Sequence, residues 1–419
     1  MQHDNQTNMA DTFCRVCNSN DVNLLLSLGR QPPANDLAMD RISAIAAERY
    51  DLSLLMCNQC LYVWLKEGVP KEKLFRYNTY LTGISLETRN DMRNFAESCI
   101  ASCDLDSSSK VLDIASNDGT LLEIFRKKTD HVFGIDPSSN ACAIASSKGI
   151  KTINDFFGGD TVDKILREFG KTDLITATNI ITHVDDPKEF FNNCKLILKT
   201  NGSIVVEFYN FESLISNTAF DQIYHEHISY FNFTTFFFLL NSIGLESYKV
   251  EQVKSQGGSL RVFISFKGNK KIDKSVNETL LAEGGMKAIK DKYVTFSQLV
   301  SRRRKDILDF LNSALNSGSK IVGYGASAKA TVLLNYLGIS RNEILAVGDK
   351  NPIKQWKYIP GVAIPVVPVE NLKEFNPDIV IIFAWNLSNE ITKELHKIFT
   401  RRITVVTFMP KISSVRLGD

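Results

Sequence analysis

The sequence predicts an α/β protein in three parts, an N-terminal metal-binding module followed by two units with parallel sheets. Two stretches, 111–122 and 320–330, each read as a buried strand, a tight turn of small residues and the start of a helix. This combination opens a doubly wound α/β sheet. Two C-x-x-C motifs precede both stretches. We expect the three parts to span residues 1–78, 79–268 and 269–419.

Length and composition describe an ordinary globular protein. The chain has 419 residues, 44% of them hydrophobic and 23% charged, enough for two or three domains with buried cores. A formal net charge of +2 gives no bulk attraction to nucleic acid or membrane. The polar N-terminus has no apolar segment of signal-peptide length, and no apolar run reaches the roughly 18 residues that span a bilayer. We expect a cytoplasmic protein without nucleic-acid or membrane partners, and a monomer by default.

Four of the eight cysteines predict a metal site. Cys14 and Cys17 form one C-x-x-C pair, and Cys57 and Cys60 form the other. Two such pairs supply the four thiolates of a tetrahedral zinc site and leave no position for water, so the zinc would be structural. A redox pair or unbound thiols are the alternatives. The intervening residues 18–56 must fold back as a small subdomain, within which we expect the turn-rich 29–35 to be irregular.

The central unit begins with a turn that suits a nucleoside. The strand and turn contain the candidate cofactor residues Asp113, Ala115, Asn117, Asp118 and Gly119. The turn lacks G-x-G-x-x-G, which disfavours a dinucleotide. The second strand ends in Asp136-Pro137, and a carboxylate there can bind the two hydroxyls of a ribose. Together these residues indicate the S-adenosylmethionine pocket of a methyltransferase, and an α/β domain for another nucleotide is the alternative.

Three more strands continue this sheet, at 151–153, 173–179 and 203–208, and we expect a turn at 201–202 to open the last. Asp155, Phe156 and Phe157 follow the first of these strands and could contact an adenine ring, although core packing explains the phenylalanines equally well. Asn179 ends the second strand, and His183 lies four residues further on. A lone histidine of this kind is often structural.

Residues 224–231 hold the densest acid–base cluster of the chain, with Tyr224, His225, Glu226 and His227 in succession. On an extended segment the two histidines would share one face. We favour catalysis over metal binding because no further ligand set lies nearby. Histidine is the natural proton acceptor near neutral pH, and tyrosine or glutamate can donate to an oxyanion. Earlier in the chain, Tyr77 and Tyr80 could point hydroxyls toward the same cleft or simply pack between domains.

After a glycine turn at 257–258, an alternating strand to 266 should close the central sheet, and a charged helix should follow over 284–316. The last unit repeats the strand, glycine turn and helix, with Lys329 in the first helical turn. Helix N-terminal amides and a lysine can seat a phosphate. Strands at 344–349, 379–384 and 403–408 complete this second nucleotide-binding unit.

Six motifs occur in order: the C-x-x-C pairs, QPPAN at 31–35, LDIASNDGTLL at 112–122, YHEH at 224–227, GGSLR at 257–261 and GYGASAKA at 323–330. This set resembles the sugar C-methyltransferases, which act on nucleotide-linked 4-keto-deoxysugars. The resemblance covers essentially the whole chain. It implies an N-terminal zinc domain, a central Rossmann-like class I methyltransferase domain and a C-terminal Rossmann-like domain that helps to hold the nucleotide-sugar.

The resemblance implies a catalytic set with His227 as base: His227, Tyr224, Glu226, His183, Asn179, Tyr80 and Tyr77. It supports cofactor contacts by Asp113, Ala115, Asn117, Asp118, Gly119, Asp136, Pro137, Asp155, Phe156, Phe157 and Asn179. The substrate contacts would come from Gly258, Arg261, Tyr324, Ala326, Ser327, Lys329 and Lys350. The family often has glutamate where this chain has Asp136.

The expected reaction is methyl transfer from S-adenosylmethionine to carbon 3 of a dTDP- or GDP-linked 4-keto-6-deoxysugar, after proton abstraction to an enolate. Two rivals remain. One is an O- or N-methyltransferase with another acceptor, and the other is a non-catalytic zinc- and nucleotide-binding module.

Overall fold

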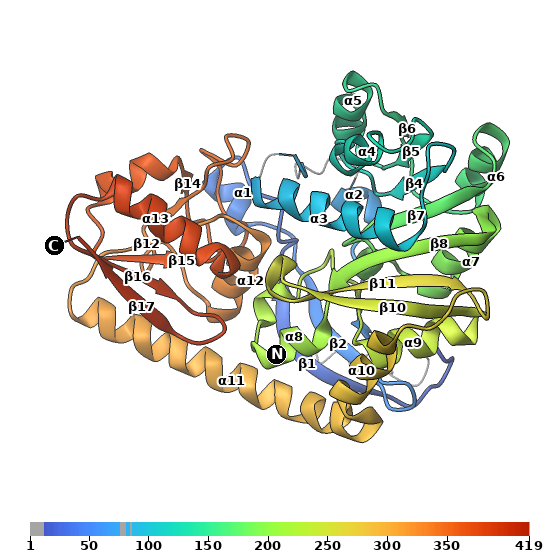
Figure 1. The fold of residues 1–419 in the computed structure, drawn as a ribbon. Coiled ribbons are helices and arrows are strands. Elements are labelled where there is room, and N and C mark those ends of the chain that lie inside the picture. Colours follow the sequence, from blue (N-terminus) through green and yellow to red (C-terminus); the bar gives the residue numbers. More distant parts are fainter. Residues whose placement is uncertain (1–11, 76–80, 84–85, 419) are drawn as a thin grey trace.

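A computed structural model describes residues 12–75, 81–83 and 86–418 of the chain. In this part of the chain the strands form three sheets of four, seven and six strands (Figure 1). The predicted catalytic residues Tyr77 and Tyr80 lie outside the described residues.

The first sheet belongs to the N-terminal module and has the strand order β1-β2-β3-β9. Its strands are β1 (Val22–Gln31), β2 (Tyr50–Cys57), β3 (Val63–Leu65) and β9 (Ser229–Tyr230), all antiparallel. The expectation of an irregular segment at 29–35 is wrong for its first three residues. They end β1, where pairing of Arg30 and Gln31 with β2 satisfies their backbone groups after a register shift.

Short helices flank this sheet. Asp40 caps α1 (Arg41–Ile45) by accepting a hydrogen bond from the Ser43 amide, and α2 is Lys71–Phe75. The segment before α1 forms an isolated bridge from Ala38 to Tyr358, so the module also contacts the C-terminal unit.

The second sheet has the order β10-β11-β8-β7-β4-β5-β6. Its five parallel strands are β4 (Val111–Ile114), β5 (Val132–Ile135), β6 (Lys151–Ile153), β7 (Thr172–Thr178) and β8 (Leu198–Tyr209). The antiparallel pair β10 (Leu245–Val253) and β11 (Ser259–Phe266) extends the sheet beyond β8. The doubly wound arrangement predicted for this unit is confirmed. Since β11 lies between β8 and β10, β10 forms the edge rather than β11.

The expected turn at 201–202 is wrong, because β8 runs unbroken from Leu198. Gly202 serves close packing instead. A Cβ atom at this position would lie 2.7 Å from a Leu198 methyl carbon and 2.9 Å from the Asp173 carbonyl oxygen.

Helices cover both faces of the second sheet: α3 (Leu86–Ser102), α4 (Thr120–Phe125), α5 (Ser139–Ser147), α6 (Gly159–Glu168), α7 (Pro187–Ile197), α8 (Phe211–Ser216), α9 (Phe233–Ser242) and α10 (Lys274–Glu283). Helix α7 illustrates how its sequence specifies it. Pro187 occupies the first turn, the Asp186 carboxylate caps the helix, and Phe190, Phe191 and Cys194 place apolar side chains on the sheet.

The third sheet has the order β14-β13-β12-β15-β16-β17. Its strands are β12 (Ile321–Tyr324), β13 (Val347–Gly348), β14 (Val366–Val367), β15 (Ile379–Ile382), β16 (Ile403–Thr407) and the antiparallel β17 (Ser413–Leu417). Helices α12 (Ala328–Leu337) and α13 (Ser388–Ile398) pack against it. The second predicted α/β unit is therefore present.

The long helix α11 (Gly285–Asn316) runs beneath both the central and C-terminal units (Figure 1). Its apolar residues join the core that also contains β1 and the C-terminal sheet. Two arginines of the 302–304 run are not free in solvent. Arg303 donates to the Phe408 carbonyl and Arg304 to the Tyr336 carbonyl.

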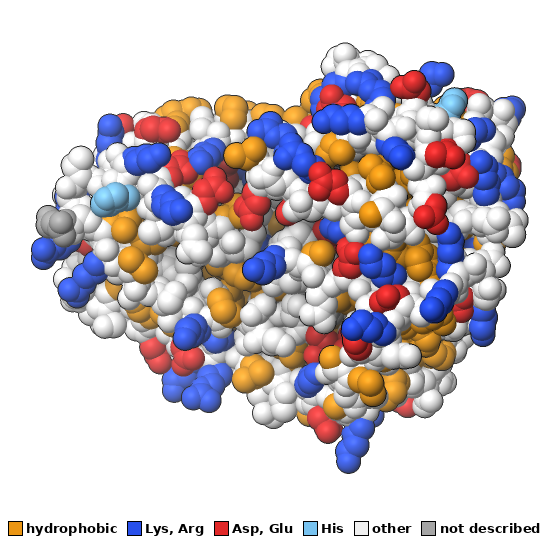
Figure 2. Space-filling view, viewed as in Figure 1, with side chains coloured by type: hydrophobic (Ala, Val, Ile, Leu, Met, Phe, Trp, Pro, Cys, Tyr) orange, Lys and Arg blue, Asp and Glu red, His pale blue; other side chains and the backbone are white. Residues whose placement is uncertain are grey.

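Acidic and basic side chains are interspersed over the face shown in Figure 2, in keeping with the small net charge. None of the described helices combines the length and apolar character needed to cross a bilayer.

Candidate active site

The four predicted zinc ligands converge. Cys14 Sγ lies 3.5 Å from Cys60 Sγ, Cys17 Sγ lies 3.4 Å from Cys57 Sγ, and all four sulfurs lie within 4.8 Å of one another. Thiolates that each bind one tetrahedral zinc at about 2.3 Å are about 3.8 Å apart, so the set fits this ion. Backbone amides of Val16, Cys17 and Gln59 also point at the sulfurs, at 3.4 Å. This second layer orients the ligands for a structural zinc.

The zinc module holds the segment that carries the acid–base cluster. Strand β3 pairs with β9, and the Tyr62 hydroxyl lies 2.5 Å from the Ser229 hydroxyl. Ser229 in turn donates to the Val184 carbonyl, next to His183. One short strand therefore ties the module to both of the histidine-bearing segments.

The turn after β4 presents backbone groups at the carboxyl edge of the sheet. Ala115 and Asn117 adopt positive φ angles of 58° and 50°, which tighten the turn. The Asp136 carboxylate accepts hydrogen bonds from the Asn117 amide at 2.9 Å and from the Ser138 amide at 2.8 Å. Each carboxylate oxygen keeps a second lone pair, so Asp136 fits the predicted role of binding ribose hydroxyls.

Residues 82–83 lie across this turn. The Thr82 amide donates to the Asn117 side chain, and the Gly83 amide donates to Asp118 at 2.9 Å. Asp118 also accepts from Thr120, so it shapes the helix start that follows Gly119. Asn117 and Asp118 thus organise the turn, whatever contacts they make with a cofactor.

The other predicted cofactor residues divide into two groups. Asp113 is buried within β4 and accepts from Thr176, and burial raises the pKa of this carboxyl to about 7. Phe157 packs edge-on against Phe190, as the core-packing alternative predicts. Phe156 is half-buried and the preceding Asp155 is exposed. Asp155, Phe156 and Pro137 remain candidates for cofactor contact, as do Ala115 and Gly119 through their backbone.

The acid–base cluster forms a turn rather than an extended strand, since the His227 amide donates to the Tyr224 carbonyl at 2.8 Å. The two histidines would share a face only on an extended segment, and on this turn they point apart. His225 lies against Tyr50 of the zinc module, with 6.0 Å between ring centroids. His227 instead packs on Tyr224, at 3.9 Å between centroids, and against His183, at 5.2 Å. The structure brings Tyr224, His227 and His183 together, as the catalytic prediction requires.

The protonation of His227 follows from its hydrogen bond to the Gln222 carbonyl. Its Nδ1 lies 2.8 Å from the Gln222 carbonyl oxygen, which can only accept, so Nδ1 carries the proton and Nε2 the lone pair. Burial lowers the pKa of His227 to about 4, and the Gln222 carbonyl partly opposes this shift. Burial, with a smaller effect of His227, also lowers the pKa of His183. Both imidazoles are therefore neutral at pH 7.

Glu226 points into the zinc module, where sequence reasoning placed no partner. Its Oε1 accepts a hydrogen bond from Asn35 Nδ2 at 2.9 Å, and its Oε2 has no hydrogen-bond partner among the described residues. Burial raises the pKa of this carboxyl. In the sequence, Asn35 stood out only as the last residue of the QPPAN motif, with no role assigned to it. The Thr331 hydroxyl of α12 fixes the motif by donating to the Ala34 carbonyl at 2.8 Å.

We expect Asn35→Ala to lower kcat about tenfold without unfolding the protein, because Glu226 loses the donor that orients it. Steady-state kinetics and the melting temperature measure the two effects. Asn371→Ala is the matched control, since Asn371 makes a similar 2.9 Å bond to Glu374 away from these residues. Equal rates for the two variants would contradict a positioning role for Asn35.

Asn179 directly follows β7 at the same edge of the sheet, with φ 57°, and its amide donates to the Glu207 carbonyl at 2.7 Å. This places it beside the segment that bears His183, as predicted.

Two residues of the GGSLR motif have structural roles. Arg261 is 5% exposed, and its guanidinium binds Glu207 at 2.8 Å and Glu251 at 3.0 Å. These contacts favour a buried ion-pair network over the predicted substrate contact. A Cβ atom on Gly258 would lie 2.6 Å from the Ser213 hydroxyl, so close packing explains this glycine.

The C-terminal turn repeats the arrangement of the central one. Asp349 accepts from the Ala326 amide at 2.9 Å and from the Asn351 amide at 2.8 Å, as Asp136 does from Asn117 and Ser138. Ser327 caps α12, whereas Tyr324 and Lys350 both bind Glu394. Their substrate contacts remain predictions.

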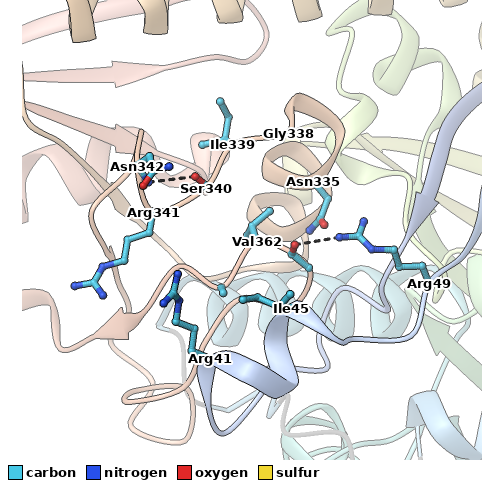
Figure 3. A pocket seen from close by; sticks show the side chains of 12 residues that line it. Arg41, Ile45, Arg49, Asn335, Gly338, Ile339, Ser340, Arg341, Asn342 and Val362 are labelled. Atoms are coloured by element: carbon cyan, nitrogen blue, oxygen red, sulfur yellow. Dashed lines mark hydrogen bonds between the residues drawn. The ribbon is translucent and has the colours of Figure 1, made fainter.

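A pocket of about 490 Å³ lies between α1 and the C-terminal end of α12 (Figure 3). Arg41, Arg49 and Arg341 line it, and Arg49 donates to the Gly361 carbonyl at 3.0 Å. No predicted site residue is among its lining residues. Cations are favoured beside the carbonyl end of a helix, which accounts for these arginines without a ligand.

Comparison with known proteins indicates the same domain order and class of protein. Three family profiles cover the chain in order: "Putative zinc binding domain" over residues 14–75, "Methyltransferase domain" over 89–250 and "C-methyltransferase C-terminal domain" over 254–410. The sheet, the cofactor turn and these matches define an S-adenosylmethionine-dependent methyltransferase with a structural zinc site.

Among the relatives, C-methyltransferase NovU of Streptomyces niveus is 29% identical over 380 residues, which is 90% of each chain. The protein described here is similar to NovU over nearly its whole length, and it is an S-adenosylmethionine-dependent C-methyltransferase. A ubiquinone biosynthesis O-methyltransferase of Rhodopseudomonas palustris (strain HaA2) is 34% identical, but over only 25% of this chain and 41% of that protein. The PH0226 protein of Pyrococcus horikoshii OT3 is similar over 48% of this chain and 100% of its own, at 18% identity and a TM-score of 0.37.

Proposed function

We propose that this enzyme methylates carbon 3 of a nucleotide-linked 4-keto-6-deoxysugar, carried by dTDP or GDP, in branched deoxysugar biosynthesis. The observation that supports this most is His227, a neutral imidazole with a fixed tautomer beside Tyr224 and His183. Methylation at carbon requires removal of a C–H proton, for which a base of this kind is needed. Transfer to a hydroxyl needs less basic assistance.

In the proposed reaction His227 Nε2 takes the proton alpha to the ketone, and the Gln222 carbonyl stabilises the imidazolium that forms. A ketone is acidic enough only when its enolate oxygen is stabilised by hydrogen bonds. Tyr224 and His183 are the candidate donors. Glu226 is a third, because burial raises the pKa of its carboxyl and so favours the protonated form that can donate.

S-adenosylmethionine supplies an electrophilic methyl group to the carbon. The turn around Asn117 and the Asp136 carboxylate would hold this cofactor at the edge of the sheet that also carries Asn179. Positioning the two reactants in one cleft would contribute much of the remaining acceleration. The zinc site, with four thiolates, takes no chemical part in this proposal.

The direct test incubates the protein with S-adenosylmethionine and dTDP- or GDP-linked 4-keto-6-deoxysugars, and locates the new methyl group by NMR. We expect a methyl signal bonded to carbon 3 of the sugar. A methyl group on oxygen or nitrogen would refute C-methylation of this substrate class.

The pH profile provides a second test. Because the pKa of His227 is lowered to about 4, the histidine stays in its basic form as pH falls from 7 to 5 and is protonated only near 4. We therefore expect the acidic limb of kcat/KM to lie below pH 5, with circular dichroism to check that the fold persists. An acidic limb near 6.5, the ordinary pKa of histidine, would show that His227 is solvated in the working enzyme.

A further inference from the structure

Trp385 links the C-terminal unit to the segment that carries the catalytic base. It lies in the loop after β15, and its Nε1 donates to Asp221 Oδ2 at 2.9 Å. The next residue, Gln222, provides the carbonyl that fixes His227. One hydrogen bond therefore connects the C-terminal loop to the residue adjacent to the contact that orients the base.

The GGSLR motif accommodates the indole ring. A Cβ atom on Gly257 would lie 2.8 Å from the Trp385 ring, and Gly257 has a φ of 97°. Both the lack of a side chain and the backbone conformation therefore favour glycine here. Neither interaction is explained by cofactor binding.

Trp385 also supports a lysine from α12. Lys329 Nζ lies 4.8 Å from the centre of the Trp385 ring and donates to Asn386 Oδ1 at 2.8 Å. In the described part of the chain no carboxylate lies within 4.0 Å of this ammonium, although its charge acts on both Asp221 and His227. Helix α12 packs beside these residues through a ring contact between Tyr336 and Phe220, and lies at the boundary of the two units (Figure 1).

The Asp221 carboxylate and the Lys329 ammonium lie near each other without a direct ion pair. Asp221 is 1% exposed, and among the described residues its Oδ1 has no hydrogen-bond partner. Lys329 is half-buried. A cation and a carboxylate that are partly or fully desolvated near each other without direct contact incur a desolvation cost with little Coulombic return. An anionic group that binds the lysine would offset that cost for the cation.

We propose that Trp385 is a positioning residue that holds the Lys329 ammonium at the catalytic cleft, where it binds an anionic oxygen of the substrate. This inference rests on the proposed function. The oxygen belongs either to the diphosphate or to the enolate formed by His227, and the two sources share the same charge-assisted hydrogen bond to lysine. The C-terminal unit thereby contributes to the chemistry and not only to nucleotide binding.

The variants Lys329→Met, Lys329→Arg and Trp385→Phe test the proposal. Phenylalanine keeps a ring beneath Lys329 but removes the hydrogen bond to Asp221. Lys397→Met and Trp356→Phe are matched controls, since Lys397 and Trp356 are exposed and lie outside the cluster. Two measurements are made on each: calorimetric affinity for dTDP and GDP, and turnover together with solvent exchange of the C3 proton.

If the diphosphate is the anion, Lys329→Met should weaken nucleotide binding about 10- to 100-fold and raise KM more than it lowers kcat. If the enolate is the anion, nucleotide affinity should stay unchanged while exchange and kcat fall by a similar factor. Trp385→Phe should change whichever of nucleotide affinity or turnover Lys329→Met changes, in the same direction but by a smaller factor. Lys329→Arg should retain most of the parental value. If Lys329→Met changes neither quantity, the proposal is overturned.

The pH dependence of activity distinguishes a charged role of Lys329 from a merely structural one. Burial lowers the pKa of Lys329 to about 8, so its charge, and with it activity, should be lost as pH rises through about 8. In Lys329→Arg this alkaline limb should disappear, because arginine stays charged. Failure of the two proposals can be told apart. If the parent protein methylates no ketosugar but Lys329→Met still weakens nucleotide binding, only the proposed function is refuted. If the parent protein methylates no ketosugar and Lys329→Met binds nucleotide unchanged, both proposals are refuted.

Discussion

His227→Asn should abolish methyl transfer and leave the protein folded. Asparagine can still donate to the Gln222 carbonyl, which is the hydrogen-bond partner of the imidazole, but it has no basic nitrogen. General base catalysis typically contributes 10²–10⁴-fold, so we expect kcat to fall by about three orders of magnitude. Exchange of the C3 proton in D₂O, followed by NMR without S-adenosylmethionine, isolates the step assigned to His227.

His131→Asn is the matched control, because His131 is exposed before β5 and outside the cluster. It should exchange and turn over substrate like the parent protein. Retained C3–H exchange in His227→Asn would move the base elsewhere, and His183 is then the next residue to test. Because the two rings lie 5.2 Å apart, a small shift of substrate would bring His183 into reach.

Cys60→Ser should remove the zinc and destabilise the active site along with the module. Binding free energies of structural zinc in small peptides reach about 10–16 kcal/mol at pH 7, and loss of even a few kcal/mol lowers the melting temperature by roughly 10 °C. The effect should extend to activity, since β9 pairs with β3 of this module immediately after the catalytic turn. Metal content by mass spectrometry, the melting temperature and kcat measure the three consequences.

Cys103→Ser controls for the substitution itself. Cys103 is partly buried and lies outside the zinc set, and its sulfur lies 3.6 Å from the Tyr248 hydroxyl. It should keep one zinc per chain and near-parental activity. A Cys60→Ser protein that binds one zinc and melts like the parent would exclude Cys60 as a ligand.

Much of the fold could be predicted from the sequence because its signals are local. The strand, turn and helix patterns at 111–122 and 320–330 depend on residues that are neighbours in the chain, and both units are present. The C-x-x-C pairs carry the same kind of information, because the spacing itself makes two thiolates available to one ion. The four sulfurs indeed converge.

Two of the differences from the sequence analysis come from pairing between distant segments, and a third comes from a local turn. Arg30 and Gln31 look irregular by composition, yet they pair with Asp51 and Tyr50 of β2 after a register shift around Gly29. The two-residue strand β9 is too short to give a periodic pattern. The turn at Tyr224 separates His225 from His227, and the extended-segment assumption could not anticipate it.

The candidate site shows the same difference between local signals and contacts of distant segments. His227, Tyr224 and His183 could be named from residue chemistry, and the structure brings them together. Asn35 and Trp385 could not, because an amide or an indole has no distinctive chemistry until its partner is known. Their partners, Glu226 and Asp221, lie 191 and 164 residues away.

The pairing of β9 with β3 also limits how the chain can be divided. A fragment without residues 12–75 would leave the Ser229–Tyr230 edge with free amides and carbonyls and would expose the apolar face that now covers β3. Unprotected edges of this kind promote self-association. Excised methyltransferase halves of this protein should therefore aggregate, and exchange of N-terminal modules between relatives will succeed only if the short strand is exchanged with them.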